Sequence, residues 1–406
     1  MPNYWDSPHL FSSGDTLRAD HLRTVIASLE RKFNGGITGA DFDVSSGKFT
    51  LPASLDLMGH ELKGAVNVPT GIVNIRSLGV AGTGSGDEGR AMQAAYEKAK
   101  ARGISVVFHP GGVYESSTTI RVPNDLHIIG SGPGTIFRSS NPDGQTPFFR
   151  FVGDTTAGGA FVMRDFRITA TNGAAKLNTG ILVDSPRKGA VIENVYFDNL
   201  EAAVRVTASD KVSLSHIFVT NCKKAVVSSQ TSALSLDAIY ARTEEDSFDV
   251  RDAQGFRVNG VNIRNSSGGH GAIFAACVGG NIQGDFSFNK KSGLVLQGCS
   301  GVSVDASTVI GNSALSGAEL HPGVLFDGCT GCSLTATVSV RFSTSYQPTY
   351  GVHIKGGDGN TVAFCVLTPN GGPDGSETGE NDAWAIKDEG SRTKVLGIYR
   401  FPLSAT

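Results

Sequence analysis

The chain has 406 residues, of which 52 are glycine, and its hydrophobic and charged shares are 39% and 18%. An average protein holds ~7% glycine, and this excess disfavours a helix-rich fold, while the hydrophobic share excludes a chain disordered by composition. The formal net charge of −3 predicts no broad basic surface, so we expect no nucleic-acid partner.

The first segment, residues 1–36, is predicted to be an arm that contains a helix. Residues 15–33 follow a helical pattern in which Leu22, Leu29 and Phe33 lie on one apolar stripe. This helix lies outside the repeats and has no evident partner in its own chain. We therefore expect it to pack around the axis of a homotrimer, and the alternative is packing on the chain's own coils.

Two further elements precede the repeats. Residues 37–76 hold short alternating runs between turn residues and are predicted to form a small β-rich collar. Residues 87–103 have the pattern of a second helix. The first coil of a solenoid exposes strand edges and core, and we expect this helix to cover them. The capped repeats then form a third domain, residues 77–406.

Targeting signals and cysteine usage restrict the other classes of protein. The start MPNYWDSPHL lacks the basic residues and apolar run of a signal peptide, and no segment approaches the ~18 apolar residues of a membrane span. We expect no membrane insertion. The six cysteines are scattered and are predicted to stay reduced. Cys329 and Cys332 alone do not supply the ligands of a zinc site, so we expect no metal and no cofactor.

A short repeat determines the predicted fold. A small residue, an apolar residue, any residue and a second apolar residue recur at steps of 22 to 32 residues. A second alternating run follows most of these anchors, and alternation with period two indicates strands. Such a unit cannot bury its apolar face alone, so we predict an all-β fold, a parallel β-helix of about ten coils. The anchors begin at Gly180, Ala203, Ala225, Ser247, Gly271, Gly293, Gly323, Gly351 and Ala383.

Residues at fixed places in the coils should stack. Asn199 and Asn221 each stand four residues before an anchor, as does Asn289. Asparagine tolerates the left-handed conformation of tight turns, and we expect these amides to form a ladder. The thiols that stand six residues after an anchor are expected to form a buried stack, and they belong to Cys277, Cys299 and Cys329.

The segment before the repeats resembles a known family. The matching motifs are Gly84-Ser-Gly-Asp-Glu, Met92-Gln-Ala-Ala, Val106-Val-Phe-His-Pro-Gly-Gly-Val-Tyr and Ile128-Ile-Gly-Ser-Gly. They resemble the opening of the pectate-lyase-like β-helix superfamily, which implies a right-handed, single-stranded parallel β-helix. The superfamily includes lyases, hydrolases, epimerases and phage tailspikes, so the resemblance specifies the fold more closely than the chemistry.

The whole chain also resembles a short phage tailspike or tail fibre. Residues 51–69 are similar to collar segments of phage tail proteins. This resemblance implies a homotrimer, attachment to tail or portal-proximal virion proteins through residues 1–76, and a host surface polysaccharide as ligand. It also implies assembly in the host cytoplasm and a final location in the virion tail.

Candidate chemistry lies between the last strand of one coil and the next anchor. Insertions at 311–322, 341–350 and 367–382 fall at this junction and are expected to protrude on one side. Tyrosine rings and carboxylates suit sugars, and the alternative is that the insertions are three solvated loops. Within the insertions we select Glu319 as a catalytic candidate and, as substrate-binding candidates, His321, Tyr346 and Tyr350.

The same junction holds a second group of charges. We select Glu244 and Asp249 as the catalytic pair, with Asp246 and Arg251 contacting substrate. Glycosidases use two carboxyl groups ~5–9.5 Å apart, a separation that coils ~4.8 Å apart easily provide. The alternative is an ordinary ladder of surface ion pairs, with Glu201, Lys223 and Glu245 in one row and Lys224 and Asp246 in the next.

Three aromatic residues are expected to form a row across neighbouring coils. Tyr196, Phe218 and Tyr240 recur at steps of 22 and are expected to face outward, as a subunit interface or a sugar platform.

The predicted function is a virion tailspike that binds host lipopolysaccharide O-antigen or capsule. As a polysaccharide depolymerase, the protein would be expected to cleave its substrate by hydrolysis rather than by elimination. The alternatives are a non-enzymatic receptor-binding or structural fibre and, third, a free lyase or epimerase.

Overall fold

The computed structural model of the chain divides into two compact units, Met1–Thr70 and Gly71–Thr406. The predicted arm and most of the collar lie outside the described residues. Their roles in trimer formation and in attachment to the virion therefore stay predictions. The structure describes residues 71–141, 146–153, 160–171, 178–185, 189–264, 266–310, 312–313, 321–338, 350–363, 366–367, 386–396 and 399–400.

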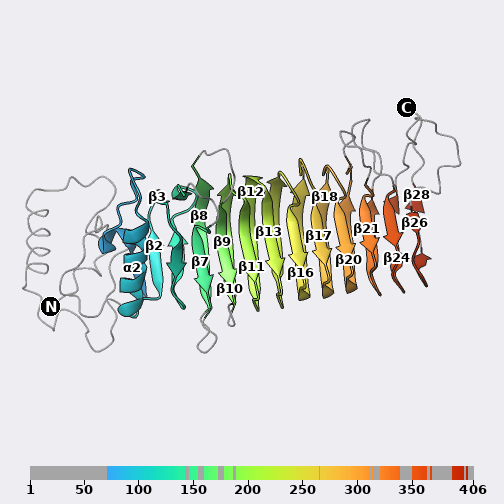
Figure 1. Ribbon diagram of the computed structural model, residues 1–406, viewed down its shortest axis with the longest axis horizontal. Coiled ribbons are helices and arrows are strands. Elements are labelled where there is room, and N and C mark those ends of the chain that lie inside the picture. The colour runs from blue at the N-terminus through green and yellow to red at the C-terminus, as the bar shows by residue number, and fades with distance from the viewer. Residues whose placement is uncertain are drawn as a thin grey trace, which may run out of the picture. The chain divides into compact units, whose positions relative to one another are not determined.

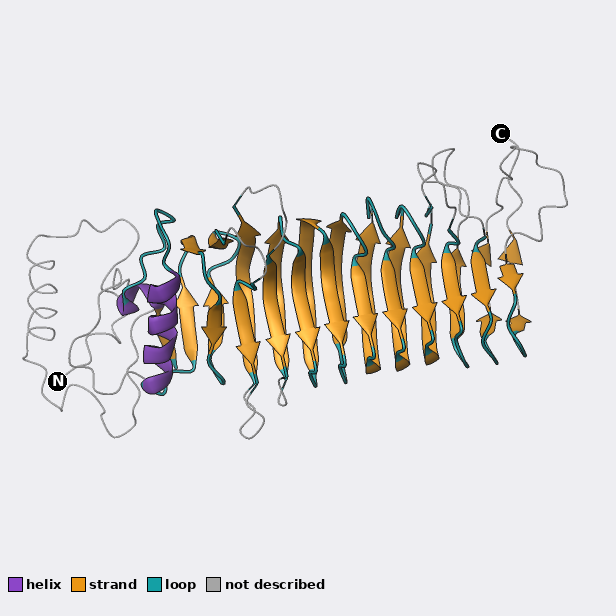
Figure 2. Cartoon of the chain, in the orientation of Figure 1, coloured by secondary structure: helices purple, strands orange, loops and turns teal. Residues whose placement is uncertain are grey.

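Two long sheets form the second unit (Figures 1 and 2). The 11-stranded sheet, called sheet B, consists of β4 (Ile120–Val122), β7 (Phe149–Val152), β9 (Thr179–Asp184), β11 (Ala202–Thr207), β13 (Lys224–Ser229), β15 (Phe248–Arg251), β17 (Ala272–Ala275), β19 (Leu294–Gln297), β21 (Val324–Asp327), β23 (Val352–Lys355) and β26 (Ile386–Asp388). The 17-stranded sheet, called sheet A, consists of β1 (Ile72–Asn74), β2 (Val106–His109), β3 (Gly112–Ser116), β5 (His127–Gly130), β6 (Thr135–Ser139), β8 (Phe161–Ala170), β10 (Ala190–Asp198), β12 (Val212–Cys222), β14 (Ser235–Thr243), β16 (Gln254–Arg264), β18 (Val278–Ser287), β20 (Ser300–Val309), β22 (Ser333–Val338), β24 (Thr361–Ala363), β25 (Val366–Leu367), β27 (Lys394–Leu396) and β28 (Tyr399–Arg400).

The register of sheet B follows the repeat seen in the sequence. Val226 of β13 pairs with Phe248 of β15, and Phe248 pairs with Ala272 of β17. Each partner is the apolar residue that follows a predicted anchor, and all of these pairings are parallel. The predicted right-handed parallel β-helix is therefore confirmed.

Left-handed residues give each coil its corners. The long strands β8 and β10 each contain one residue with positive φ, Asp165 (63°) and Asn194 (52°), and β12 contains two, His216 (52°) and Asn221 (51°). Short polar side chains are enriched in this conformation. The first half of β8 pairs with β5 and its second half with β6. The bend thus divides sheet A into two faces, which close around the core with sheet B.

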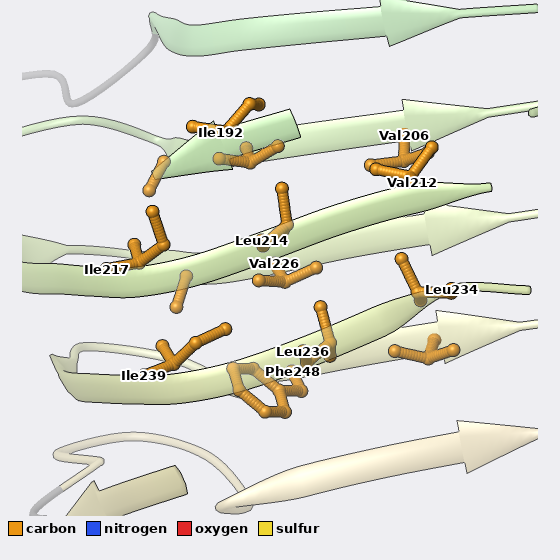
Figure 3. Close-up of a cluster of buried hydrophobic side chains, with 14 of the residues drawn as sticks. Ile192, Val206, Val212, Leu214, Ile217, Val226, Leu234, Leu236, Ile239 and Phe248 are labelled. Atoms are coloured by element: carbon orange, nitrogen blue, oxygen red, sulfur yellow. The ribbon is translucent and has the colours of Figure 1, made fainter. Parts of the chain in front are cut away.

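The core repeats from coil to coil. Ile192, Leu214 and Leu236 occupy one register position in β10, β12 and β14, and Val226 and Phe248 face them from sheet B (Figure 3). All five side chains are fully buried. Burial of each such side chain contributes ~1.5–3 kcal/mol before the entropy of ordering is subtracted.

The helix predicted over residues 87–103 forms as α2 (Gly89–Ala101) beside the first coil (Figure 2). Its alanine-rich sequence favours a helix. Met92, Tyr96 and Ala99 line its buried face and belong to the common core. The helix therefore closes this end of the core, as predicted. No helix in the described part of the chain is long and apolar enough to cross a membrane.

Two motif side chains complete this cap through backbone contacts. The Gln93 side chain donates to the carbonyl of Arg121 at 3.2 Å and accepts from the Arg121 N–H at 2.8 Å. Arg121 lies in β4, the edge strand of sheet B, so one amide satisfies an otherwise open strand edge. Glu88 accepts from the N–H groups of Ala81 and Gly82 at 3.0 and 2.9 Å. The short helix η1 (Ile75–Leu78) precedes this loop.

A buried histidine lies beneath the cap. Tyr96 Oη and His109 Nε2 are 2.9 Å apart, while His109 Nδ1 has no hydrogen-bond partner. The Tyr114 and Phe137 rings each lie 4.9 Å from the imidazole. Burial lowers the pKa of His109 from 6.5 to about 3, so the ring is neutral.

The predicted stack of thiols forms, but the asparagine ladder does not contain the predicted residues. Cys277, Cys299 and Cys329 are buried free thiols, as predicted. Cys299 interacts with Cys277 in one neighbouring coil and with Cys329 in the other. Asn199 and Asn221 adopt the left-handed conformation but do not extend the amide ladder. Asn199 donates to a backbone carbonyl and Asn221 to the Asp198 carboxylate. The buried amide pair instead joins Asn289 to the side-chain oxygen of Asn312, at 3.0 Å.

Candidate functional site

Strand alternation places two predicted residues on the outer surface of sheet B. Phe248 and Val250 point into the core and are fully buried, so Asp249 and Arg251, which alternate with them in β15, point outward. Asp249 pairs with Val227 of β13 on one side and with Ile273 of β17 on the other. A ligand can therefore reach Asp249 only where the side chains of the neighbouring strands leave its carboxylate exposed.

Two cations hold the Asp249 carboxylate. Lys224 Nζ lies 3.1 Å from Oδ2 and Arg251 Nε lies 2.8 Å from Oδ1. Burial raises the pKa of Asp249, but the hydrogen bonds and charges of Arg251 and Lys224 outweigh it, and the pKa falls below its ordinary value. The side chain is only 9% exposed, whereas that of Arg251 is 59% exposed. Asp249 is thus ionised at neutral pH and suited to accept a proton or position a cation, not to donate a proton.

The turn before β15 adds further polar groups. Glu244 is exposed, and its backbone N–H donates to the Cys222 carbonyl at 2.9 Å. Asp246 Oδ1 accepts the backbone N–H of His270 at 2.7 Å, which ties two consecutive coils together. His270 Nδ1 accepts the N–H of Ser292 at 3.2 Å. This bond leaves the proton of a neutral His270 ring on Nε2.

The His270 ring also meets a predicted residue from farther along the chain. The His270 and His321 ring centroids lie 5.5 Å apart in an edge-to-face arrangement. Burial lowers the pKa of His270 to about 4, against the opposing charge of Asp246. Sequence reasoning missed His270. A signal existed, because it stands one residue before an anchor, as Lys224 and Asp246 do.

These residues come from neighbouring coils around β15 and are called here the sheet B cluster. An open depression of about 520 Å³ lies elsewhere, lined by residues 76 and 79–83 of the cap region, and shares no residue with this cluster. In the described part of the chain, no group of three or more histidine, cysteine, aspartate or glutamate side chains could hold a metal ion. The members of the cluster are Lys224, Glu244, Asp246, Asp249, Arg251, His270 and His321.

The remaining predicted site residues do not join this cluster. Tyr350 lies at the start of a coil nearer the C-terminus, with its ring 5.3 Å from that of His353. Glu319 and Tyr346 lie outside the described residues, as do most of the three insertions. The predicted charge ladder also differs, because no ion pair within 4.0 Å links the described residues Glu201, Lys223 and Glu245.

The aromatic row on sheet A stacks along the coils. The Tyr196 and Phe218 centroids are 4.7 Å apart with an interplanar angle of 9°, and Tyr240 pairs with Phe218 in the next strand. Because the ring separation equals the spacing of neighbouring strands, the paired faces cover one another and the ring edges point away from the sheet. A sugar stacks on a ring face, so this geometry disfavours the platform and leaves the subunit interface as a prediction.

Comparison with known proteins gives one family and several similar structures. The family described as rhamnogalacturonase A/epimerase, pectate lyase-like, matches residues 72–152. A mannuronan C5-epimerase, AlgE3 of Azotobacter vinelandii, is 28% identical over 125 residues, which are 29% of this chain and 6% of that protein. The chain therefore spans a small fraction of the curated relative that it matches.

The similar structures include enzymes and a viral protein. The A-module of mannuronan C-5 epimerase AlgE6 from A. vinelandii has a TM-score of 0.58 and 16% identity, covering 82% of this chain and all of that one. The lid-less DFA-IIIase of Arthrobacter chlorophenolicus A6 has a TM-score of 0.59 and 13% identity, covering 80% and 94%.

The enzymatically active domain of bacteriophage CBA120 tailspike protein 2 has a TM-score of 0.56 and 14% identity, covering 82% of this chain and 52% of that one. Identities this low establish the fold alone. Together with the parallel register of the coils, these structural matches show a parallel β-helix fold, and residues 72–152 are similar to a pectate lyase-like family.

Proposed function

We propose that this protein is a phage tailspike or tail fibre that binds host surface polysaccharide, O-antigen or capsule, through the sheet B cluster. The observation that carries the proposal is the convergence of carboxylates, cations and imidazoles on successive coils of one outer surface. Sugars bind through hydroxyl groups that need both donors and acceptors, and this surface supplies both. The similarity to a phage tailspike supports the same proposal.

The proposal includes assembly and location. The protein acts as a homotrimer, held by the helix at 15–33, and residues 1–76 attach it to tail or portal-proximal proteins of the virion tail. The apolar stripe of that helix and the collar motifs support this part of the proposal. The outward aromatic row at Tyr196, Phe218 and Tyr240 is proposed as a contact between coils of neighbouring subunits.

Cleavage is proposed to be hydrolysis by two carboxyl groups. Asp249 is ionised by its two cations and serves as base or nucleophile, and the exposed Glu244 serves as proton donor. Glu319 remains a proposed third carboxylate. Asp246, Arg251 and His321 contact substrate, with Tyr346 and Tyr350 farther along the chain.

A non-enzymatic fibre is the second candidate function, and one observation favours it. Both oxygens of Asp249 already have cationic partners, which suits a structural role for this carboxylate. A free lyase or epimerase is the third candidate. A stable monomer with unchanged activity after removal of residues 1–75 would support that third possibility against the trimeric spike.

The test compares binding and cleavage in one set of variants. Purified protein is incubated with lipopolysaccharide or capsule from candidate hosts, the glycan is sized, and new reducing ends and unsaturated ends are measured. Glu244→Gln and Asp249→Asn should abolish shortening, whereas Glu193→Gln on sheet A is the matched control. Shorter glycans with reducing ends establish a hydrolase, and unsaturated ends establish a lyase. Binding without shortening leaves an adsorption fibre, and absence of binding for all host glycans refutes the proposal.

A further inference from the structure

A second group of polar and aromatic side chains lies on the outer surface of sheet B, nearer the C-terminus. Tyr350 stands one residue before an anchor, the place that Asp246 and His270 take in their coils. His353 points outward in β23 and pairs with Lys387 in β26. Glu389 follows β26, and its N–H donates to the Ile354 carbonyl at 2.8 Å. These four residues, called the C-terminal cluster, are Tyr350, His353, Lys387 and Glu389.

The cluster is held together by specific contacts. Glu389 Oε1 lies 2.7 Å from Lys387 Nζ, and Glu389 Oε2 lies 3.3 Å from His353 Nε2. Lys387 Nζ lies 5.5 Å from the centroid of the Tyr350 ring, within the range of a cation–π contact. The geometry thus combines an aromatic ring, a cationic donor and an anionic acceptor within one small area.

The exposure of this ion pair argues that stability alone does not account for it. The side chains of Lys387 and Glu389 are 39% and 45% exposed, and ion pairs so exposed contribute only ~0–1 kcal/mol. One ammonium and one carboxylate leave no net charge between them. An anion would be repelled by Glu389 and a cation by Lys387, whereas adjacent hydroxyl groups of one sugar can accept from Lys387 and donate to Glu389.

The cluster lies in line with the sheet B cluster. The outward positions of successive strands run from Asp249 to Ile273, Val295, Leu325 and His353. Four strand spacings make this separation about 19 Å. The three intervening side chains are apolar, and Val295 is only 7% exposed although it points outward. One polymer chain lying along the coils would reach from Asp249 to His353, whereas a short fragment would reach only one of these two residues.

We infer that the C-terminal cluster binds an uncharged sugar unit of the same polysaccharide, about 19 Å from the unit held at Asp249. Tyr350 and His353 provide apolar ring surface, Lys387 donates and Glu389 accepts. This inference rests on the proposed function and adds to it a ligand class, a direction and a minimum length. High affinity then requires an oligosaccharide that spans from Asp249 to the C-terminal cluster.

The experiment measures affinity against oligosaccharide length. Oligosaccharides of graded length, prepared from the glycan that the wild type binds, are titrated by calorimetry into the full chain. Lys387→Met and Glu389→Gln are compared with Lys394→Met, which removes an exposed lysine from β27 in sheet A. Circular dichroism verifies that every variant is folded.

The expected result is a selective loss. Wild-type affinity rises once the oligosaccharide exceeds about 19 Å, and Lys387→Met or Glu389→Gln lowers affinity for these long chains about tenfold. Affinity for short chains stays unchanged, as does every affinity of Lys394→Met. If both cluster variants bind long chains as the wild type does, or lose short and long chains equally, the inference is wrong while the proposed function stands. If the wild type binds no glycan of any length, the proposed function and the inference both fall.

Discussion

The buried imidazole of His109 should make the cap the acid-sensitive part of the molecule. Its pKa is about 3 in the folded state and 6.5 when unperturbed. Because protonation favours the unfolded chain, the contribution of this ring to stability is complete above pH 6.5 and is lost as the pH falls toward 3. The free energy of unfolding should drop by about 2 kcal/mol by pH 5, of a limiting value of about 5 kcal/mol.

The variant that tests this reasoning is His109→Gln. Glutamine keeps an acceptor for the Tyr96 hydroxyl and does not titrate. The variant should be less stable than the wild type at about pH 7.5, because it fills less of the space between Tyr114 and Phe137, and should lose about 2 kcal/mol less on moving to about pH 5. Denaturant unfolding followed by circular dichroism measures both changes. His216→Gln, an exposed histidine, is the control.

Other histidines titrate in the same direction, so the difference between variants is the informative quantity. Burial also lowers the pKa of His270 and of His127, and the wild type should lose stability through all three rings. If His109→Gln and the wild type lose the same free energy between the two pH values, the neutral buried imidazole beneath α2 is not the cause, and the argument from its missing Nδ1 partner fails.

Three further substitutions test other contacts. Gln93→Leu should lower stability by about 2 kcal/mol and promote concentration-dependent association through β4, and light scattering would show no such association if the edge is protected otherwise. Asp249→Asn should lower stability by about 2 kcal/mol because Lys224 loses its counter-ion, and adding Lys224→Met should restore part of it; strict additivity in calorimetry would disprove the coupling. Phe218→Leu should cost about 1 kcal/mol in thermal unfolding with glycan binding unchanged, and weakened binding would reinstate the sugar platform.

The fold was predictable because its information is local and repeated. The anchors that place Val226, Phe248 and Ala272 in one register follow from spacing alone, since a one-residue slip would turn each core side chain outward. The thiol stack at Cys277 and Cys299 follows from the same spacing. The presence of α2 and its position over the first coil follow from alanine-rich sequence and from the open strand edge that it must cover, whereas the helix itself is two residues shorter at each end than predicted.

The candidate site was less predictable because its contacts cross between coils at irregular distances. Asp249 is neutralised by Lys224 from the preceding coil, a diagonal contact that a row of equivalent positions does not reveal. The ring contact of His321 with His270 spans the coil between them. The asparagine ladder failed for a related reason. Asn199 and Asn221 turn the chain at a left-handed corner, whereas Asn289 lies beside a different one, at Phe288.

The uninterrupted coils have an evolutionary consequence. Between residues 203 and 246 two consecutive coils of 22 residues follow one another without insertion, and each presents the same strand edges above and below. A tandem duplication of one such segment would keep every ladder in register and lengthen the stack by about 4.8 Å. The number of coils and the residues on any one coil can therefore change independently, so descent with modification can alter the reach of the solenoid without rebuilding its cap.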